Sequence, residues 1–239
     1  MRRLLLTIGI LSAGFAHTAL AADMPLKAVP RIVEPVSNWT GVYVGGNVGY
    51  SWGNFGATGA VVSPTGSQTY NVDGVIGGVQ AGFNWQFNRN WLVGIEGDYQ
   101  WSGEKDSNSW LFPITLGDAR SGFTIANEYK LPWFATARAR LGYLPDPNWL
   151  VYATGGVAVG KVTGNASLSL GALSASVNDS TTKTGWTIGG GVETKIGGSN
   201  WSTKLEYLYI DLGTVNFYSN AVSIRARDHV VRLGLNYKF

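Results

Sequence analysis

The chain has 239 residues, of which 45% are hydrophobic, only 14% are charged and 33 are glycine. This composition argues against a coiled coil or a charged disordered tail, and a mean hydropathy near zero is too low for a bundle of membrane helices. The formal charge of +3 comes with no basic stripe for nucleic acid, and the absence of cysteine excludes disulfides, Cys-ligated zinc and thiol catalysis.

The N-terminus has the organisation of a secretory signal peptide, which we predict for residues 1–21. Two arginines precede an apolar run at 4–16, and small residues follow at 19–21. The run is shorter than the ~20 residues that a membrane-spanning helix needs. Three prolines within 22–38 favour an extended periplasmic tether. We therefore expect an exported chain whose folded domain comprises residues 39–239.

The folded part carries a fourfold repeat. An Asn-Trp pair recurs at 38–39, 90–91, 148–149 and 200–201. The last three pairs each follow a turn signal and open a run in which apolar residues alternate with polar or small ones, as in β-strands. The alternation predicts eight strands, in chain order at 39–52, 74–87, 91–102, 129–143, 149–163, 184–196, 201–212 and 229–239.

The connections between these strands alternate in length. They are short at 88–90, 144–148 and 197–200, and long and polar at 53–73, 103–128, 164–183 and 213–228. Tight periplasmic turns and long external loops are typical of transmembrane β-barrels. We therefore predict an all-β fold, an eight-stranded antiparallel transmembrane up-and-down β-barrel with four short periplasmic turns or ends and four long external loops. A soluble up-and-down barrel is the alternative, because alternation does not say which face points inward.

The distribution of aromatic residues favours the membrane barrel. On the apolar faces, tryptophan gathers at the strand ends, and in the strand at 129–143 this face includes Leu131. The tryptophans are Trp85, Trp91, Trp149 and Trp201 on the turn side and Trp52, Trp101, Trp133 and Trp186 on the loop side. Two such belts are typical of the two membrane interfaces.

The charged faces are expected to fill the lumen. Glu96 and Asp98 share one face and resemble an acid–base pair, but arginines on the next strand favour a charge network, because an unpaired ion in the interior is costly. The expected network comprises Glu96, Asp98, Arg138, Arg140, Glu193, Lys204, Glu206 and Arg232, with Lys195 on the same face. We therefore predict no catalytic residue, no metal site and no enzyme, and at most a narrow solute path.

One further cluster lies near the C-terminus. Arg225 and Arg227 of the fourth loop are two apart, so they share one side of an extended segment, and His229, at the loop end of the last predicted strand, continues the same alternation. Guanidinium groups grip carboxylate or phosphate oxygens, and a neutral imidazole ligates haem iron. The alternative is a solvated or interfacial histidine. Two functions therefore remain open: a structural or pore-like barrel, and a surface receptor for haemin or another anionic ligand, such as the phosphates of lipopolysaccharide. No cofactor other than haemin is expected.

Three stretches resemble a known family. They are Trp39-Thr40-Gly41-Val42-Tyr43-Val44-Gly45-Gly46-Asn47, Gly82-Phe83-Asn84-Trp85-Gln86-Phe87 and Leu233-Gly234-Leu235-Asn236-Tyr237-Lys238-Phe239. The chain resembles the small porin-like outer-membrane barrels of alphaproteobacteria, which include major surface proteins and haemin-binding proteins.

The resemblance implies an eight-stranded barrel in the outer membrane of a Gram-negative bacterium, in contact with lipid and lipopolysaccharide. It also implies insertion by the barrel-assembly machinery, with the C-terminal aromatics Tyr237 and Phe239 as the recognition signal. It implies no single activity and leaves the oligomeric state open. The function that we expect is a contribution to envelope structure and surface interactions.

Overall fold

The computed structural model describes residues 38–58, 67–116, 119–217 and 222–239. The predicted signal peptide, and the predicted tether up to residue 37, lie outside the described residues. In the described part, no helix is long and apolar enough to cross a membrane.

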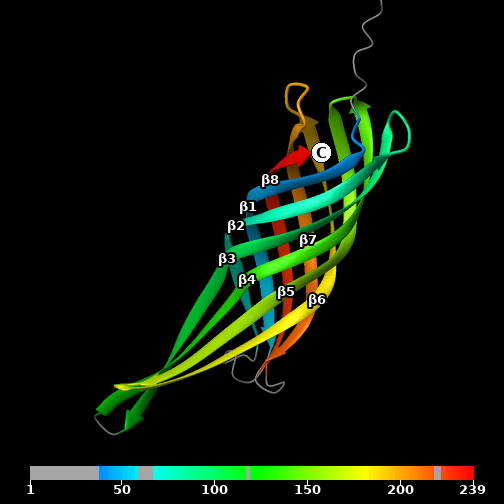
Figure 1. The fold of residues 1–239 in the computed structure, drawn as a ribbon. Coiled ribbons are helices and arrows are strands. Elements are labelled where there is room, and N and C mark those ends of the chain that lie inside the picture. The colour runs from blue at the N-terminus through cyan, green and yellow to red at the C-terminus, as the bar shows by residue number, and fades with distance from the viewer. Residues whose placement is uncertain (1–37, 59–66, 117–118, 218–221) are drawn as a thin grey trace, which may run out of the picture. The chain divides into compact units, whose positions relative to one another are not determined.

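Eight antiparallel strands close into a barrel in chain order, and β8 pairs with β1 (Figure 1). The strands are β1 (Gly41–Thr58), β2 (Ser67–Gln86), β3 (Trp91–Leu116), β4 (Ala119–Asp146), β5 (Trp149–Leu170), β6 (Leu173–Lys195), β7 (Trp201–Phe217) and β8 (Val222–Lys238). This confirms the predicted fold class. Closure leaves the wall without a free strand edge, which suits a bilayer because every backbone polar group there needs a partner.

The outer face of the wall is apolar and carries an aromatic belt at each end. On the turn side, Trp85 and Trp149 expose 57% and 49% of their surface, and on the loop side Trp101 and Trp186 expose 57% and 50%. Large apolar side chains between the belts, such as Ile95, also point outward. An exposed apolar band this continuous is unfavourable in water and favourable against lipid.

Glycines allow the wall to pack closely around its interior. A Cβ atom added at the inward-facing Gly156 would lie only 2.1 Å from the backbone oxygen of Ala137 on the neighbouring strand. At Gly155, which faces outward, the nearest atom would be the backbone oxygen of Thr187 at 3.6 Å, an ordinary contact. Glycine at position 156 is therefore required by close approach of the backbone.

The strands extend further on the loop side than the sequence predicted. β3 and β4 remain paired from Trp101↔Trp133 out to Leu116↔Ala119, and β5 and β6 remain paired out to Leu170↔Leu173. The prediction of long loops at 103–128 and 164–183 was therefore wrong, and the loops predicted at 53–73 and 213–228 likewise begin and end as strand. Serine, threonine and asparagine on the outer side of these extensions gave them the composition of loops.

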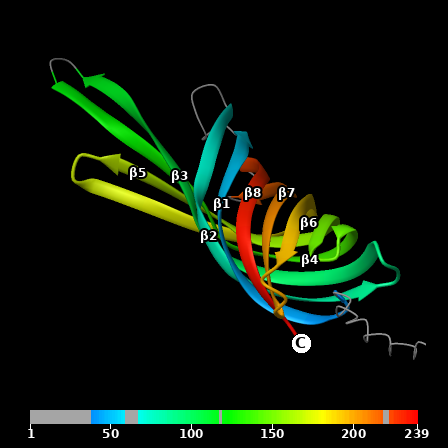
Figure 2. The ribbon, with the colours of Figure 1, turned by 90° about the horizontal axis from the view of Figure 1, so that it is seen from above.

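These extensions form a second region, which we call the projecting sheet. It consists of residues 106–116 of β3, 119–130 of β4, 161–170 of β5 and 173–185 of β6. The pairing of β2 with β3 ends at Asp73↔Lys105, and that of β6 with β7 ends at Trp186↔Asp211. Beyond these positions, the β3 edge separates from β2 and the β6 edge separates from β7. The projecting sheet therefore extends away from the barrel wall, as Figures 1 and 2 show.

The barrel interior is filled by three layers of side chains. A small apolar layer near the turns contains Trp39, Leu92, Leu144, Leu150 and Tyr152. The eight predicted lumen charges form the middle layer. The third layer, toward the loops, is a large apolar cluster that includes Phe55, Tyr70, Ile76, Tyr129, Leu131, Phe134, Leu208 and Val230. Neither of the two apolar layers was predicted from the sequence.

Leu131 shows one reason for that omission. The pairing of β4 shifts register between Lys130 and Trp133, so the alternation of faces is interrupted there. Leu131 consequently points into the interior and is 1% exposed, whereas Trp133 stays on the outer face next to Trp101. The prediction that Leu131 faces outward with Trp133 was wrong for this reason.

Candidate functional site

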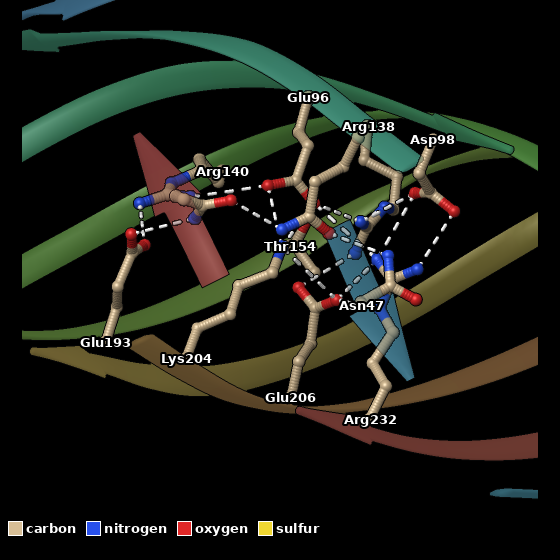
Figure 3. A network of polar contacts seen from close by, with 12 residues as sticks. Asn47, Glu96, Asp98, Arg138, Arg140, Thr154, Glu193, Lys204, Glu206 and Arg232 are labelled. Carbon is tan, nitrogen blue, oxygen red and sulfur yellow. Dashed lines mark hydrogen bonds and ion pairs between the residues drawn. The ribbon is translucent and has the colours of Figure 1, made fainter. Parts of the chain in front are cut away.

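The charged middle layer is assembled from five strands, β3, β4, β6, β7 and β8. Alternation turns Glu96 and Asp98 of β3 inward, and pairing places Glu96 directly opposite Arg138 of β4. In the same way β7 and β8 place Glu206 opposite Arg232. The two pairs face each other across the barrel and meet at its centre (Figure 3).

Arg138 and Arg232 connect the carboxylates of the two sides. Arg138 lies 2.5 Å from Glu96 Oε1, 2.9 Å from Asp98 Oδ2 and 3.0 Å from Glu206 Oε1. Arg232 Nη1 lies 2.9 Å from Asp98 Oδ1, and its Nη2 lies 2.6 Å from Glu206 Oε2. Both arginine side chains are fully buried. Asp98 and Glu206 thus each contact both arginines.

Lys204 and Arg140 complete the network toward the turns. Lys204 Nζ lies 2.8 Å from both carboxylate oxygens of Glu96. Arg140 Nη2 lies 2.9 Å from Glu193 Oε2. The eight predicted lumen residues therefore come together as four cations and four carboxylates, without net charge (Figure 3).

Neutral side chains occupy further hydrogen-bonding positions of the carboxylates. The hydroxyl of Tyr43 donates to Glu96 Oε2 at 2.7 Å, and that of Tyr152 donates to Glu206 Oε1 at 2.9 Å. Ser202 and Asn236 both donate to Oε1 of Glu193. Buried ions are tolerated when they are paired and hydrogen-bonded in this way. The arrangement is that of a packed, self-compensated layer.

Lys195 lies outside this network. Its ammonium group donates to the backbone oxygen of Asn38 at 3.1 Å and sits 5.1 Å from the centre of the Trp39 ring. Trp39 in turn donates from Nε1 to the backbone oxygen of Pro147 at 3.0 Å. The expectation that Lys195 joins the lumen charges was wrong, because it lies one residue from the end of the predicted strand, where it covers Trp39 at the turn-side mouth.

The residues predicted as an anion site lie on the outer wall. Arg225, Arg227 and His229 belong to β8, where they alternate with the buried Ala226 and Asp228. The placement of Arg225 and Arg227 in a loop was therefore wrong, whereas the placement of His229 in the last strand is confirmed and the shared side follows from the alternation. We refer to these three residues as the outer-wall cluster.

The arginines of the outer-wall cluster share one counterion. Arg225 Nη2 lies 3.1 Å and Arg227 Nε lies 3.5 Å from the same oxygen, Oδ2 of Asp211. The arginine side chains are 55% and 45% exposed, and the cluster lines a shallow pocket of about 350 Å³ together with Tyr209. One carboxylate neutralises only one of the two guanidinium charges, so the site keeps a positive charge.

His229 is part of the loop-side aromatic belt. Its Nδ1 lies 2.7 Å from the hydroxyl of Tyr207, and its ring stacks on Trp52 with 5.9 Å between centroids and 11° between planes. One ring nitrogen and one ring face are therefore already engaged. The two arginines follow on the loop side of this belt, the level at which lipid head groups lie.

The two predicted assembly residues lie at the turn end of the barrel. The Tyr237 ring packs edge-on against Trp201 at 5.0 Å and against Phe239 at 5.2 Å. The backbone N–H of Phe239 donates to the carbonyl oxygen of Val42 at 3.0 Å. The Phe239 side chain is 71% exposed on the outside. In the described part of the chain, no three His, Asp or Glu residues are placed to hold a metal ion.

Known proteins are similar in sequence to this chain along nearly its whole length. Residues 8–239 match the model of the outer membrane protein beta-barrel domain. The 31 kDa outer-membrane immunogenic protein of Brucella melitensis biotype 1 is 38% identical over 96% of this chain and 97% of its own length. The 25 kDa outer-membrane immunogenic protein of Brucella abortus is 30% identical over 99% and 100%. The 22 kDa outer membrane protein of Rhizobium leguminosarum is 32% identical over 87% and 81%. The chain therefore belongs to the outer membrane protein beta-barrel family and is an outer-membrane protein of a Gram-negative bacterium.

Proposed function

We propose that this protein is a closed barrel that contributes to envelope structure and surface interactions and forms at most a narrow pore for solutes. The charged middle layer, in which four cations balance four carboxylates, is the observation that supports this proposal. Contacts of 2.8–3.0 Å between its cations and carboxylates cross the lumen from β3 and β4 to β7 and β8. A passing ion would have to displace several of these buried pairs at once, at a high electrostatic cost.

The apolar layers above and below support the same function. Phe134 and Tyr70 on the loop side and Leu92 on the turn side are fully buried inside the barrel. An eight-stranded barrel has an interior just wide enough for side chains to fill. An ion would therefore meet two apolar layers in addition to the charged one.

Single-channel recording in planar bilayers tests the proposal. We expect the refolded, demonstrably monomeric protein to give no stable large channels. A variant that removes volume from every layer, Trp39→Ala with Glu96→Ala, Arg138→Ala and Phe134→Ala, should conduct more. The control variant Glu128→Ala with Lys130→Ala removes one acid and one base as well, but from an exposed ion pair outside the lumen. Neither variant changes the net charge. Stable large channels from the unmodified monomer would overturn the proposal.

A second function, binding of an anionic head group, is favoured by the outer-wall cluster. Arg225 and Arg227 are half-exposed and share the single carboxylate of Asp211, just beyond the aromatic belt. Guanidinium groups bind phosphate in bidentate fashion, and the phosphates of lipopolysaccharide lie at this level of the outer leaflet. Haemin fits less well, because the imidazole of His229 is bonded to Tyr207 and stacked on Trp52.

Binding measurements on variants separate the two ligands. We expect Arg225→Ala with Arg227→Ala to weaken lipopolysaccharide binding several-fold, and His229→Ala to leave it nearly unchanged. The matched control, Lys105→Ala with Lys161→Ala, removes the same charge from another surface. If haemin binds saturably and His229→Ala abolishes that binding, haemin is the ligand instead. Parental binding of both ligands by the double arginine variant would rule out the site.

A further inference from the structure

Two buried acids, Glu104 of β3 and Asp228 of β8, lie outside the charged middle layer. Their exposed fractions are 1% and 2%. Glu104 comes after Trp101 of the loop-side belt, and Asp228 comes directly before His229 of the same belt. Because this belt marks the external membrane interface, both acids lie inside the barrel at its external end, beyond the membrane-spanning part.

A glycine allows the two acids to approach the same hydroxyl group. Ser51 of β1 pairs with Gly74 of β2, and a Cβ atom added at Gly74 would lie only 2.7 Å from the backbone nitrogen of Glu104. Since Gly74 has no side chain, the side chain of Glu104 reaches past it toward Ser51. From the other side, Asp228 accepts a hydrogen bond from Ser51 Oγ at 2.6 Å. The two carboxyl groups are therefore neighbours and repel each other when both are charged.

The hydrogen bonds of the two acids differ. Asp228 accepts from Ser51 Oγ through Oδ2 at 2.6 Å and from the backbone N–H of His229 through Oδ1 at 2.9 Å. Glu104 accepts from Ser102 Oγ through Oε1 at 2.9 Å, whereas its Oε2 is buried without a hydrogen-bond partner. A carboxylate needs donors for both oxygens. The surroundings therefore suit an ionised Asp228 but would leave an ionised Glu104 with an unpaired oxygen.

No cation compensates the two acids. Among the side chains that the structure describes, no lysine or arginine lies within ion-pair distance of either carboxyl group. The charged layer begins only beyond the neutral Gln100 and Val230. The other titratable groups near the pair are Asp73 of β2 and Lys105 of β3, which are exposed, Asp106 of β3, which accepts from the backbone N–H of Asn71, Arg227 and His229 on the outer wall, Asp211 of β7, which contacts Arg227, and Tyr70 in the loop-side apolar layer.

We propose that Glu104 remains protonated at neutral pH and that loss of this proton loosens the external end of the barrel. With the proton in place, the pair carries a single charge, and the hydroxyl of Glu104 has the carboxylate of Asp228 beside it as an acceptor. Without the proton, two negative charges face each other in the interior with no cation, which is costly. Burial, and repulsion by Asp228, accordingly raise the pKa of Glu104 well above its ordinary value.

The pH dependence of unfolding tests the proposal. An unfolded glutamate loses its proton near pH ~4.3, so above this pH unfolding of the parent releases the proton of Glu104. The contribution of this group to stability is therefore greatest in acid and decreases as the pH rises toward the raised pKa. Glu104→Gln has nearly the same shape and no such proton. We expect the unfolding equilibrium constant of the parent, divided by that of Glu104→Gln, to rise about tenfold per pH unit between about pH 5 and pH 7, in urea titrations of the refolded barrel.

Glu193→Gln is the matched control, because it is the same substitution at a carboxyl group that is also buried, with 3% exposed. Arg140 Nη2 lies 2.9 Å from Glu193 Oε2, so the amide leaves a buried cation without its partner. At neutral pH, Glu193→Gln should therefore destabilise the barrel, whereas Glu104→Gln should stabilise it. The opposite signs separate a compensated buried acid from an uncompensated one.

Infrared spectroscopy observes the proton directly and does not depend on the folding of a variant. A protonated carboxylic acid has a carbonyl stretching band that a carboxylate lacks. We expect this band in the folded parent at neutral pH, and we expect its loss in Glu104→Gln but not in the exposed control Glu128→Gln.

Three results would overturn the proposal. The first is a ratio of unfolding constants that changes by less than about threefold between about pH 5 and pH 7, since Glu104 would then titrate as in the unfolded chain. The second is a folded Glu104→Gln barrel that is destabilised at neutral pH as Glu193→Gln is. The third is a folded parent without the carboxylic acid band at neutral pH, or a band that persists in Glu104→Gln and so belongs to another acid.

Discussion

The barrel interior and the projecting sheet contain ion pairs of almost equal length but of different environment. In the interior, Arg138 Nη2 lies 2.9 Å from Asp98, and both side chains are fully buried. On the projecting sheet, Lys130 lies 2.8 Å from Glu128, with side chains 39% and 33% exposed. Water screens the exposed pair, whereas the buried ions have no solvent to replace a lost partner. The distance between the charged groups alone therefore says little about how much each ion pair contributes to the stability of the fold.

The difference separates a region that must remain constant from one that can vary. Each charge in the barrel contacts partners on several strands, so one change leaves other ions uncompensated. On the projecting sheet, residues such as Ser174 and Asn178 are exposed on a sheet that has water on both sides. Surface segments of this kind tolerate substitution and carry specificity.

The largest effect is expected from removing a central cation. Arg138→Met leaves three cations for four carboxylates and deprives Glu96, Asp98 and Glu206 of one partner each. The expected loss is about 3–5 kcal/mol in the free energy of unfolding, measured by urea titration of the refolded barrel. A loss below about 1 kcal/mol would show that the network does not stabilise the interior.

A comparable contrast is expected between apolar residues of the two regions. Phe134→Ala empties part of the loop-side layer and should cost about 3–5 kcal/mol, because the side chain is fully buried. Leu111, which is 70% exposed on the projecting sheet, serves as the control. Leu111→Ala should change the urea midpoint little. Equal shifts for the two variants would contradict the assignment of the core to the barrel interior.

Adjacent glycines of β5 allow a finer test. Gly156→Ala places a methyl group against the backbone of Ala137 and should destabilise by about 1–3 kcal/mol. Gly155→Ala meets only ordinary contacts and should be neutral or stabilising by up to about 1 kcal/mol, since alanine loses less conformational freedom in a strand. The temperature at which the heated band appears on a detergent gel orders the two variants, and the reverse order would refute the inward orientation of position 156.

The smallest effect is expected on the projecting sheet. Glu128→Gln with Lys130→Gln removes the exposed pair and should change the free energy of unfolding by less than about 1 kcal/mol. The change should also diminish in high salt. A loss as large as that of Arg138→Met would mean that the projecting sheet is an equal part of the cooperative unit.

The strand count, the aromatic belts and the charged lumen residues could be predicted from the sequence, because charged and apolar positions alternate there with strong contrast. The strands and the interior layer on the loop side of the barrel could not be predicted. At Val75 and Ile76 both faces of the strand are apolar, one toward the outside and one toward the interior, so alternation loses its contrast. At Leu131 a register shift reverses the faces, and its local sequence signal is Pro132, which the alternation pattern does not take into account.

The outer-wall cluster shows the same limit. Its spacing predicts that Arg225 and Arg227 share a side, but not that Asp211 of β7 lies opposite Arg227 and contacts both arginines. A register shift follows directly after Asp211, between Asp211 and Gly213, where φ of Gly213 is +73°. Contacts across strands at a bulge depend on tertiary pairing rather than on local pattern.

A double-mutant cycle on Arg232 and Asp98 tests the central claim most directly, because these residues are joined by two contacts, at 2.9 Å and 3.2 Å. Unfolding free energies are measured for the parent, Arg232→Leu, Asp98→Leu and the double variant, and compared with the same cycle on Lys130 and Glu128. We expect a coupling energy of about 1–3 kcal/mol in the lumen and less than about 0.5 kcal/mol on the projecting sheet. Additive losses in the lumen cycle would contradict the claim that a mutually compensated charge network fills and stabilises the barrel.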